Sequence, residues 1–504
     1  MTGLIYGGSG SAGVSGFYIR WPAQGINPAL PGAGRTQAGG DPLPDFYDLV
    51  YGMKKISEKT TQEILSGNLV KAILSLAVPV MINSFLQTMY NLTDTYWLGQ
   101  LGTSELAGIN LISPVQSIVV NFGSGLTVAG SVLIARYVGA KKTEDAKSMA
   151  NQIFASAMIF SLTCATLIFL LSPLIVKALG AEGDVAKVAE TYLKLVILDM
   201  PFLYTVNMFQ SVNQAQGDTV RPMLLNLLGI CINMVADPLL MVVLKLGAAG
   251  AALATVFAKM IPAVIAFILL NNKKRAVYLD LRNLHFERKK IRDIITIGLP
   301  SAIGGSVTQF AFLLLTKSVL EYGEEAMAAY GVGNKINGLI SLPSNGIGSA
   351  VATIVSQNMG AGQEKRARKA YKMAMSGIVI FLLVGGFILS RIPVSTGIVK
   401  IFTDDPEVIV MGARYLSILA FWCFFNGVHN STMGFFQGCG HTEVTMAVDV
   451  LRLWVFRFAT LFVCQKILHL GVESIWYCVV VSNALAPIVL VIVYLTGYWK
   501  RKRI

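Results

Sequence analysis

Long apolar stretches recur along the chain from about residue 70 to Tyr498, and short polar segments separate them. Stretches such as Ile153 to Leu171 are long enough to cross a bilayer as helices, because the hydrocarbon core requires about 20 residues in helical conformation. The pattern predicts twelve membrane-spanning helices, at residues 69–98, 106–136, 149–171, 187–212, 222–245, 248–271, 293–320, 327–358, 370–391, 410–436, 443–466 and 472–499.

The composition agrees with a protein whose solvent is lipid. Of the 504 residues, 54% are hydrophobic and only 14% are charged, whereas soluble domains carry about 25% charged residues. The apolar stretches leave no room between them for a large soluble domain. We therefore predict an all-α polytopic membrane protein that is surrounded by the lipid bilayer.

The formal net charge of +13 would also suit a nucleic-acid partner, but most Lys and Arg residues fall in short connections between the predicted helices. Positive charge in such connections marks the cytoplasmic side of a membrane protein. The basic segments are 136–147, 273–292, 365–369 and 500–503. We therefore expect no nucleic-acid partner, and we expect a multi-pass protein of the cell inner membrane with both termini in the cytoplasm.

Residues 1–52 differ from the rest of the chain because they are rich in Gly, Pro and Ser and contain no apolar stretch that could serve as a signal peptide. We expect this segment to be disordered. Met53 is followed directly by Lys54 and Lys55, a typical cytoplasmic start. We hypothesise that the native chain begins at Met53, and the intact mass of protein from the native host would test this.

An internal repeat divides the helices into two sets of six. An offset of 221 residues aligns Pro79 with Pro300 and Gly139 with Gly360. Beyond a two-residue insertion the offset is 223, and it aligns Tyr192 with Tyr415, Gly217 with Gly440 and Thr219 with Thr442. Because each repeat holds an even number of helices, the halves share one orientation and are related by a pseudo-twofold axis along the membrane normal. We expect an N-lobe at 53–272, a basic cytoplasmic linker at 273–292 and a C-lobe at 293–504.

Few ionisable residues fall inside the predicted spans, where each charge is costly and requires a partner or a function. Asp94 ends an unusually polar run in the first helix, and Asp237 lies four residues after Asn233 on the same face of the fifth helix. Pro238 removes a backbone donor in that turn. Two carboxylates with amides nearby can hold Na⁺ or a proton. The alternative is that both acids only cap or bond neighbouring helices.

The other intramembrane charges are predicted to be structural. Asp449 and Arg452 are three residues apart and can pair with each other, whereas Lys259 can lie toward a helix end and Asp199 can be hydrated beside a helix break. No G-x-x-x-x-G-K-[ST] run is present, so ATP is not expected to drive the protein directly. We expect no enzymatic activity and no cofactor other than a coupling ion.

From about residue 65 onward the sequence resembles the multidrug and toxic compound extrusion (MATE) family, and in particular its DNA-damage-inducible (DinF-like) branch. The segments that carry this resemblance are Leu76–Pro79, Gln87–Asp94, Ile134–Ala140, Gln216–Thr219 and Asn233–Pro238. The resemblance implies two six-helix lobes around a central cavity. It also implies antiport of organic cations or amphipathic drugs against H⁺ or Na⁺ by a monomer.

The resemblance also implies a set of site residues. The cation site of the branch corresponds here to Asp94, Asn207, Asn233, Asp237 and Thr255, with Asp94 and Asp237 as candidate ligands of Na⁺. The candidates for the substrate cavity are Gln87, Tyr90, Asn91, Gln210, Gln309, Lys335 and Asn426. Two of these, Gln309 and Asn426, are neutral at positions where another branch has acids in the C-lobe, so we expect ion coupling in the N-lobe.

Two other functions remain open at this stage. A lipid-linked oligosaccharide flippase of the same superfamily would use a cavity ringed with Arg and Lys, whereas most basic residues here lie in loops. A receptor or scaffold without transport activity would not need paired acids inside the membrane. The identity of the substrate and the choice between H⁺ and Na⁺ do not follow from the sequence.

Overall fold

A computed structural model of the chain describes residues 60–501, and within that range the regular structure is helical throughout. The expected disorder of residues 1–52 and the hypothetical start at Met53 lie outside the described residues. The helices of the first half are α2 (Leu69–Leu98), α3 (Thr103–Gly139), α4 (Thr143–Ala178), α5 (Gly183–Val196), α6 (Met200–Ala215), α7 (Val220–Asp237) and α8 (Gly247–Leu270). Those of the second half are α9 (Arg288–Leu320), α10 (Glu324–Gly360), α11 (Glu364–Leu389), α12 (Ile392–Val399), α13 (Pro406–Phe421), α14 (Phe424–Cys439), α15 (Thr442–Val450), α16 (Arg457–Phe462) and α17 (Glu473–Leu495).

Each of the twelve predicted spans has a helical counterpart. In the described part of the chain, ten helices are long and apolar enough to cross a membrane, and the bent pair α13 and α14 makes eleven. The remaining predicted span, 443–466, is helical but consists of α15 and α16 joined and extended by two π-helical segments, η4 (Leu451–Phe456) and η5 (Val463–Ile467). We call helices α2–α8 the N-lobe and helices α9–α17 the C-lobe.

Three of the spans are broken, and the sequence indicated two of these breaks, beside Asp199 and at Pro238, but not the third. The fourth span is divided by one turn of 3-10 helix, η1 (Ile197–Asp199), just before Pro201. The corresponding span of the second half bends by 51° between α13 and α14. The fifth span ends in a π-helical segment, η2 (Pro238–Val243), directly after Asp237, as expected where a proline removes a backbone donor. These breaks bring backbone and polar side chains together inside the bundle.

The repeat detected in the sequence is present in the hydrogen bonding. The Thr219 hydroxyl donates to the Leu76 carbonyl oxygen at 3.1 Å, and the Thr442 hydroxyl donates to the Ile297 carbonyl oxygen at 2.9 Å. These residues are related by the offsets of 223 and 221 residues that the sequence predicts. The same contact therefore fixes the start of α7 against α2 in one lobe and the start of α15 against α9 in the other.

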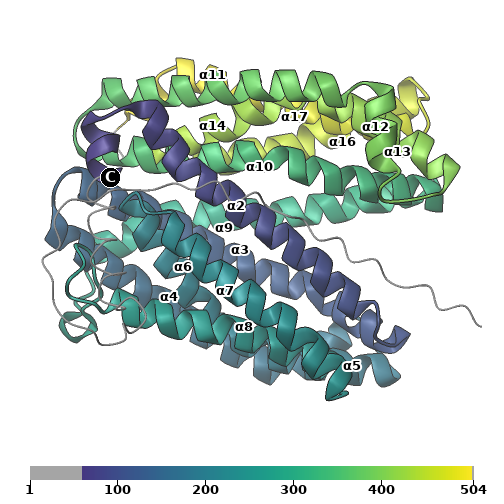
Figure 1. Ribbon diagram of the computed structural model, residues 1–504, viewed down its shortest axis with the longest axis horizontal. Coiled ribbons are helices and arrows are strands. Elements are labelled where there is room, and N and C mark those ends of the chain that lie inside the picture. Colours follow the sequence, from purple (N-terminus) through teal and green to yellow (C-terminus); the bar gives the residue numbers. More distant parts are fainter. Residues whose placement is uncertain (1–59, 502–504) are drawn as a thin grey trace, which may run out of the picture. The chain divides into compact units, whose positions relative to one another are not determined.

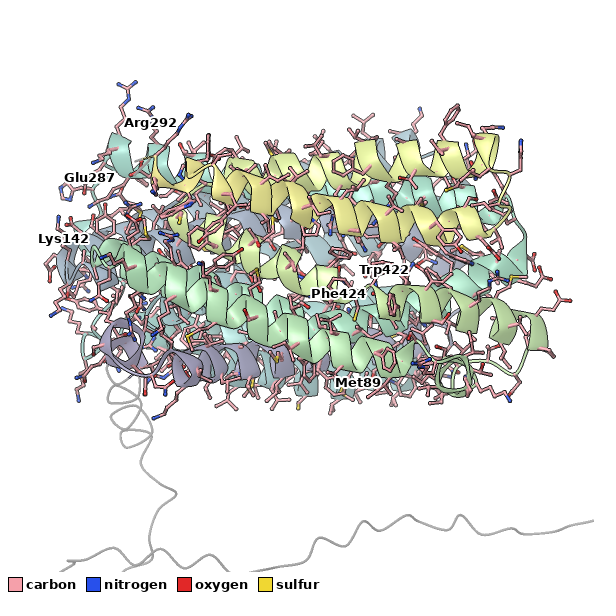
Figure 2. All side chains as sticks on the ribbon, turned by 90° about the horizontal axis from the view of Figure 1, so that it is seen from above. Met89, Lys142, Glu287, Arg292, Trp422 and Phe424 are labelled. Atoms are coloured by element: carbon pink, nitrogen blue, oxygen red, sulfur yellow. The ribbon has the colours of Figure 1, made fainter. Side chains whose placement is uncertain are left out.

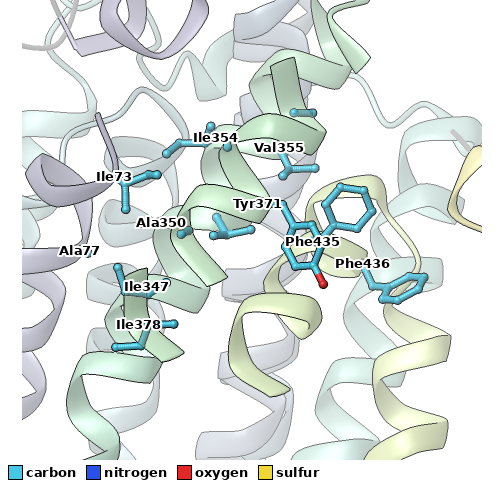
Figure 3. Close-up of a cluster of buried hydrophobic side chains, with 14 of the residues drawn as sticks. Ile73, Ala77, Ile347, Ala350, Ile354, Val355, Tyr371, Ile378, Phe435 and Phe436 are labelled. Atoms are coloured by element: carbon cyan, nitrogen blue, oxygen red, sulfur yellow. The ribbon is translucent and has the colours of Figure 1, made fainter. Parts of the chain in front are cut away.

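The lobes pack against each other mainly through α2 and α3 on α9 and α10. Figure 3 shows part of this interface, where Ile73 and Ala77 of α2 lie beside Ile347, Ala350 and Ile354 of α10. Figure 1 shows α10, α11 and α14 of the C-lobe side by side, as their contacts require. One buried apolar cluster therefore spans both halves of the chain.

The ends of α3 and α10 approach each other closely at two symmetry-related glycines. A Cβ atom on Gly139 would lie 1.9 Å from the Gln357 carbonyl oxygen, and one on Gly360 would lie 2.0 Å from the Arg136 carbonyl oxygen. Glycine is required at both positions because any side chain would push the helices apart. The Ser356 hydroxyl also donates to the Val132 carbonyl oxygen at 2.6 Å. The two lobes are therefore closed against each other at this end.

Basic connections gather at the same end. Figure 2 shows Lys142, Glu287 and Arg292 together at one end of the helices. The linker between the lobes is held there because Arg275 donates to the Asn213 side-chain oxygen at 2.6 Å. Burial, with a smaller effect of the nearby Arg221, lowers the pKa of Arg275 to about 10, so this guanidinium stays charged at neutral pH.

The close approach of α3 and α10 generates the first prediction. Gly139→Ala or Gly360→Ala should lower the free energy of unfolding by roughly 1–3 kcal/mol, because the added methyl group overpacks a backbone contact. Thermal unfolding of purified protein in detergent measures this. Gly377→Ala in α11 is the matched control, since its Cβ would meet open space. Equal melting temperatures for Gly139→Ala and Gly377→Ala would contradict the prediction.

Candidate ion and substrate site

A cavity of about 250 Å³ lies among α2, α6, α7 and α8 of the N-lobe. Figure 1 shows α6, α7 and α8 side by side in this part of the molecule. The structure brings six of the predicted site residues onto the wall of this one cavity, which we call the N-lobe cavity: Gln87, Tyr90, Asn207, Gln210, Asn233 and Thr255. They come from α2 and from the three consecutive helices α6, α7 and α8.

The two predicted acids lie next to this cavity. Asp237 is fully buried, and its negative charge and that of Asp94 act on each other across the gap between α7 and α2. The Tyr90 hydroxyl is in hydrogen-bond contact with Thr255, and both acids also act on that hydroxyl. The structure therefore gathers Asp94, Asp237, Tyr90 and Thr255 into one electrostatic group.

The Asp237 carboxylate has no cationic partner among the described residues, and its neighbouring amide is Asn233. Neither of its oxygens meets a hydrogen-bond donor with good geometry among the described residues, and the same holds for both polar atoms of Asn233, its neighbour one turn earlier. A buried carboxylate left in this way is costly unless a cation or a proton neutralises it. The donor set therefore fits a small hard cation or a proton.

A transition metal fits less well. Within residues 60–501 no group of three or more His, Cys, Asp or Glu side chains is placed to hold one metal ion. Carboxylate, amide and hydroxyl oxygens, which make up this site, are ligands for hard cations instead. The group Asp94, Asn233, Asp237 and Thr255 matches that description.

The expectation that Lys259 lies toward a helix end is wrong. Lys259 lines the N-lobe cavity from α8, and its ammonium group is ion-paired with Asp199. Asp199 is buried at the 3-10 turn between α5 and α6. The positive charge of Lys259 also acts on Asp94. This ion pair therefore borders the site, because Lys259 lies on the cavity wall and the 3-10 turn brings Asp199 against it.

Sequence reasoning also missed Asn83 and Asn226, which line the same cavity and are joined by a hydrogen bond of 3.2 Å. A signal for them was available in the spacing of polar residues. Asn83, Gln87, Tyr90 and Asp94 follow one another at helical intervals of four, three and four residues. Such a polar stripe in an apolar helix indicates the face that is turned toward a cavity.

Four predicted residues lie elsewhere. Asn91 is exposed one turn after Gln87 and accepts a hydrogen bond from it at 3.4 Å. Gln309 and Lys335 of the C-lobe are exposed, and Asn426 donates to the Ser341 hydroxyl at 3.4 Å. None of these four lines the N-lobe cavity. Their assignment to a substrate cavity between the lobes stays a prediction.

The N-lobe site can be compared with the repeated position in the C-lobe once the residues of the two lobes are aligned. Thr219 and Thr442 differ by 223 residues, but beyond η4 the offset is 224. There Lys245 and His469 both have positive φ, 55° and 52°. Gly247 and Gly471 form a second such pair, at 54° and 58°. The extra residue is absorbed by the π-helical segment η4, which has no counterpart in α7.

With this register the C-lobe counterpart of the site contains no acid. Leu315 stands where the N-lobe has Asp94, and Leu461 stands where it has Asp237. Both leucines are buried in one apolar cluster with Tyr415 and Trp476. The position of Asn233 is taken by Arg457, which is buried and donates to Ser482 and Asn483 at 3.1 and 3.2 Å. The repeated position is therefore a packed core with a fixed positive charge.

The predicted pair in the C-lobe is confirmed. Arg452 contacts the Asp449 carboxylate at 3.0 Å, and His429 contacts the same oxygen at 3.4 Å. Arg457 does not join this pair and donates instead to Ser482 and Asn483. The charged residues Asp449, Arg452 and Arg457 of the C-lobe are thus bound to each other or to neutral side chains, whereas the N-lobe places two acids, Asp94 and Asp237, near each other.

Comparison with known proteins identifies relatives for most of the chain. A family model described as MatE matches residues 79–239 and 300–463, which are the two repeats. The chain is 24% identical to the "Probable multidrug resistance protein NorM" of Thermotoga maritima, over 86% of this chain and 94% of that protein. It is 23% identical to the "Multidrug export protein MepA" of Staphylococcus haemolyticus, over 85% and 94% respectively.

Solved structures agree with the architecture. A transporter described as the "Outward-facing conformation of a multidrug resistance MATE family transporter of the MOP superfamily" has a TM-score of 0.80 and 26% identity, covering 87% of this chain and 98% of that one. A "Crystal structure of MATE in the straight conformation" has a TM-score of 0.81 and 25% identity, covering 88% and 99%. The two-lobe, twelve-helix fold is thus shared.

The unpartnered carboxylate of Asp237 generates the second prediction. If it binds a monovalent cation, the native protein should gain stability as that cation is added at fixed pH, by about 2.7 kcal/mol at a concentration one hundred times the dissociation constant. Asp237→Asn should abolish this gain because the charge is removed. Melting temperatures measured against Na⁺ concentration check both statements. Asp404→Asn, in an exposed loop, is the control that should keep the native response.

Proposed function

Because this chain belongs to the MatE family, we propose that it is a secondary active multidrug efflux transporter that exchanges organic cations or amphipathic compounds for H⁺ or Na⁺. The observation that carries the proposal is the buried Asp237 carboxylate, which has the Asn233 side chain as a neighbour but no cationic partner among the described residues, and which lies within electrostatic range of Asp94. The names of the curated relatives, which refer to multidrug resistance and export, support the substrate class.

The chemistry of the site fits an exchange of positive charges. A cation or proton on Asp94 and Asp237 neutralises two carboxylates that would otherwise stand together in a medium of low dielectric constant. An organic cation in the adjoining N-lobe cavity offers the same neutralisation. The two ligands therefore compete for one pair of charges, and binding of one from the outside favours release of the other.

The cation site lies in the N-lobe in this proposal. Asp94, Asn207, Asn233, Asp237 and Thr255 form it, and the buried Leu315 and Leu461 occupy the repeated acid positions in the C-lobe. Coupling through one lobe follows, because the C-lobe position offers no carboxylate to an ion. Assignment to the DinF-like branch is consistent with this asymmetry and stays a prediction.

Alternating access supplies the movement. The contact of Gly139 and Gly360 with opposing carbonyl groups closes the end of the molecule at which the basic loops gather. We take that end to be cytoplasmic by the positive-inside rule, with both termini there. Rocking of the lobes about the interface of α2 and α3 with α9 and α10 would separate these glycines and open the cavity to the cytoplasm. A monomer in the inner membrane suffices for this cycle.

A flippase for lipid-linked oligosaccharides is the alternative. It would require a ring of basic side chains around a large cavity, whereas the N-lobe cavity contributes Lys259 alone and that residue is ion-paired. No observation on the described residues favours it. Accumulation of lipid-linked precursor in a deletion strain with unchanged drug tolerance would favour the flippase over drug export.

The proposal predicts the behaviour of Asp94→Asn. In everted vesicles, efflux of a fluorescent cationic drug should fall to the level of vesicles without the protein, because the acid pair can no longer exchange its charges. Membrane abundance, measured by immunoblot, should be unchanged since Asn is isosteric with Asp. Normal efflux by this variant would refute ion coupling at the N-lobe site.

The coupling ion can be assigned by counterflow of the same drug in proteoliposomes. A pH gradient and a Na⁺ gradient are imposed separately, with the other ion equal on both sides. We expect one of the two gradients to drive drug accumulation in the native protein and neither to do so in Asp94→Asn. Accumulation driven by neither gradient in the native protein would contradict antiport.

A further inference from the structure

Lys259 is placed where it can interact with more than one carboxylate. Its ammonium group is paired with Asp199, whose side chain is 9% exposed, while the Lys259 side chain is 30% exposed on the wall of the N-lobe cavity. The positive charge of Lys259 also acts on Asp94. Lys259 lies one turn after Thr255 on the same face of α8, and Thr255 contacts Tyr90 beside the two acids.

The charges of this region do not balance. Asp94, Asp199 and Asp237 all act on the buried hydroxyl of Tyr192, so the three carboxylates share one electrostatic neighbourhood. Lys259 supplies one positive charge to it. Two negative charges remain when neither a coupling cation nor a cationic drug is bound, and such charges are expensive in a medium of low dielectric constant.

A lysine can move to reduce this cost. Its ammonium group is a point charge on a flexible stem with four methylene groups, whereas arginine holds a carboxylate in a rigid fork. The C-lobe shows the fixed arrangement for contrast. There the position of Lys259 is occupied by Asn483, which together with Ser482 holds the buried Arg457 guanidinium by two hydrogen bonds.

We propose that Lys259 is a tethered internal cation that exchanges between Asp199 and the Asp94–Asp237 pair, and that it competes there with the coupling cation and the organic cation. This proposal rests on the proposed function, because it presupposes that the acid pair binds exchangeable cations. When the pair is empty the ammonium group neutralises it, and when a cation arrives the ammonium group returns to Asp199.

The competition has a measurable consequence. An internal competitor lowers the apparent affinity for external cations. The apparent association constant equals the intrinsic one multiplied by the fraction of time in which the acid pair is free. The competitor also speeds the release of external cations, since the departing cation is replaced at once. Removal of the lysine charge should therefore tighten binding and slow turnover together, whereas a purely structural ion pair would not link the two quantities.

The experiment uses the full-length protein and ethidium, which is permanently charged, in buffer without Na⁺ at fixed pH. The variants are Lys259→Gln and the double variant Asp199→Asn/Lys259→Gln, which removes both members of the ion pair and leaves no unpaired acid at Asp199. Both should bind ethidium about three- to tenfold more tightly than the native protein by fluorescence titration. Both should also have a lower maximal transport rate in proteoliposomes.

The controls separate the possible results. Lys317→Gln, at an exposed lysine of α9, should bind and transport as the native protein does. Native ethidium affinity in the double variant would overturn the internal-cation role. So would a transport defect in Lys259→Gln that the double variant repairs completely. Both results indicate an ion pair that is only structural. If Asp94→Asn still shows ion-coupled transport, the proposed function itself fails. If only Asp94→Asn is defective, the proposed function stands and the role of Lys259 fails.

Discussion

The cost of an unneutralised charge in a medium of low dielectric constant is the constraint on which this structure depends. Most of the chain meets it by placing charged residues in the connections or by pairing them, as Arg452 pairs with Asp449. The N-lobe departs from that rule at Asp237, which is buried without a cationic partner among the described residues. Around this carboxylate lie a polar cavity, broken helices and the Lys259–Asp199 pair. These features supply the polar groups and the positive charge that a buried carboxylate requires.

Helix α2 connects this site with the interface between the lobes. One part of it carries Gln87, Tyr90 and Asp94 toward the N-lobe cavity, and its other end packs Ile73 and Ala77 against α10 of the C-lobe. In the proposed transport cycle, a change of charge at the site therefore acts on a helix that belongs to both the candidate site and the interface between the lobes. No separate relay between the two is needed, because one rigid element takes part in both.

Much of the fold was predictable from the sequence because the length of apolar stretches and the repeat depend on local composition. The twelve spans and the correspondence of Thr219 with Thr442 followed from those signals, and the structure shows that the two threonines make equivalent contacts. The bend between α13 and α14 and the π-helical segments were harder to predict from the sequence. Hydropathy continues smoothly across the bend between α13 and α14 and across the π-helical segments, so it carries no information about the turn of the backbone.

The same limit applies to the site. Acids in apolar helices are conspicuous, so Asp94 and Asp237 could be found from the sequence, and the structure brings Asn207, Asn233 and Thr255 to the same place. The ion pair of Lys259 with Asp199 could not be found, because the residues are 60 positions apart and only the 3-10 turn at Asp199 directs that carboxylate toward α8. Pairings of this kind depend on tertiary structure.

The π-helical segment η4 allows the two repeats to differ in length while corresponding residues stay on the same helix face. Each residue of an α-helix advances about 100° around the axis, so a residue inserted into a regular helix would rotate everything that follows it. The wider turn of η4 takes up the extra residue instead, and Arg457 and Leu461 occupy the positions that Asn233 and Asp237 hold in the N-lobe. The two lobes therefore differ at this place through the residue types at matched positions, and the packing that both halves share is left undisturbed.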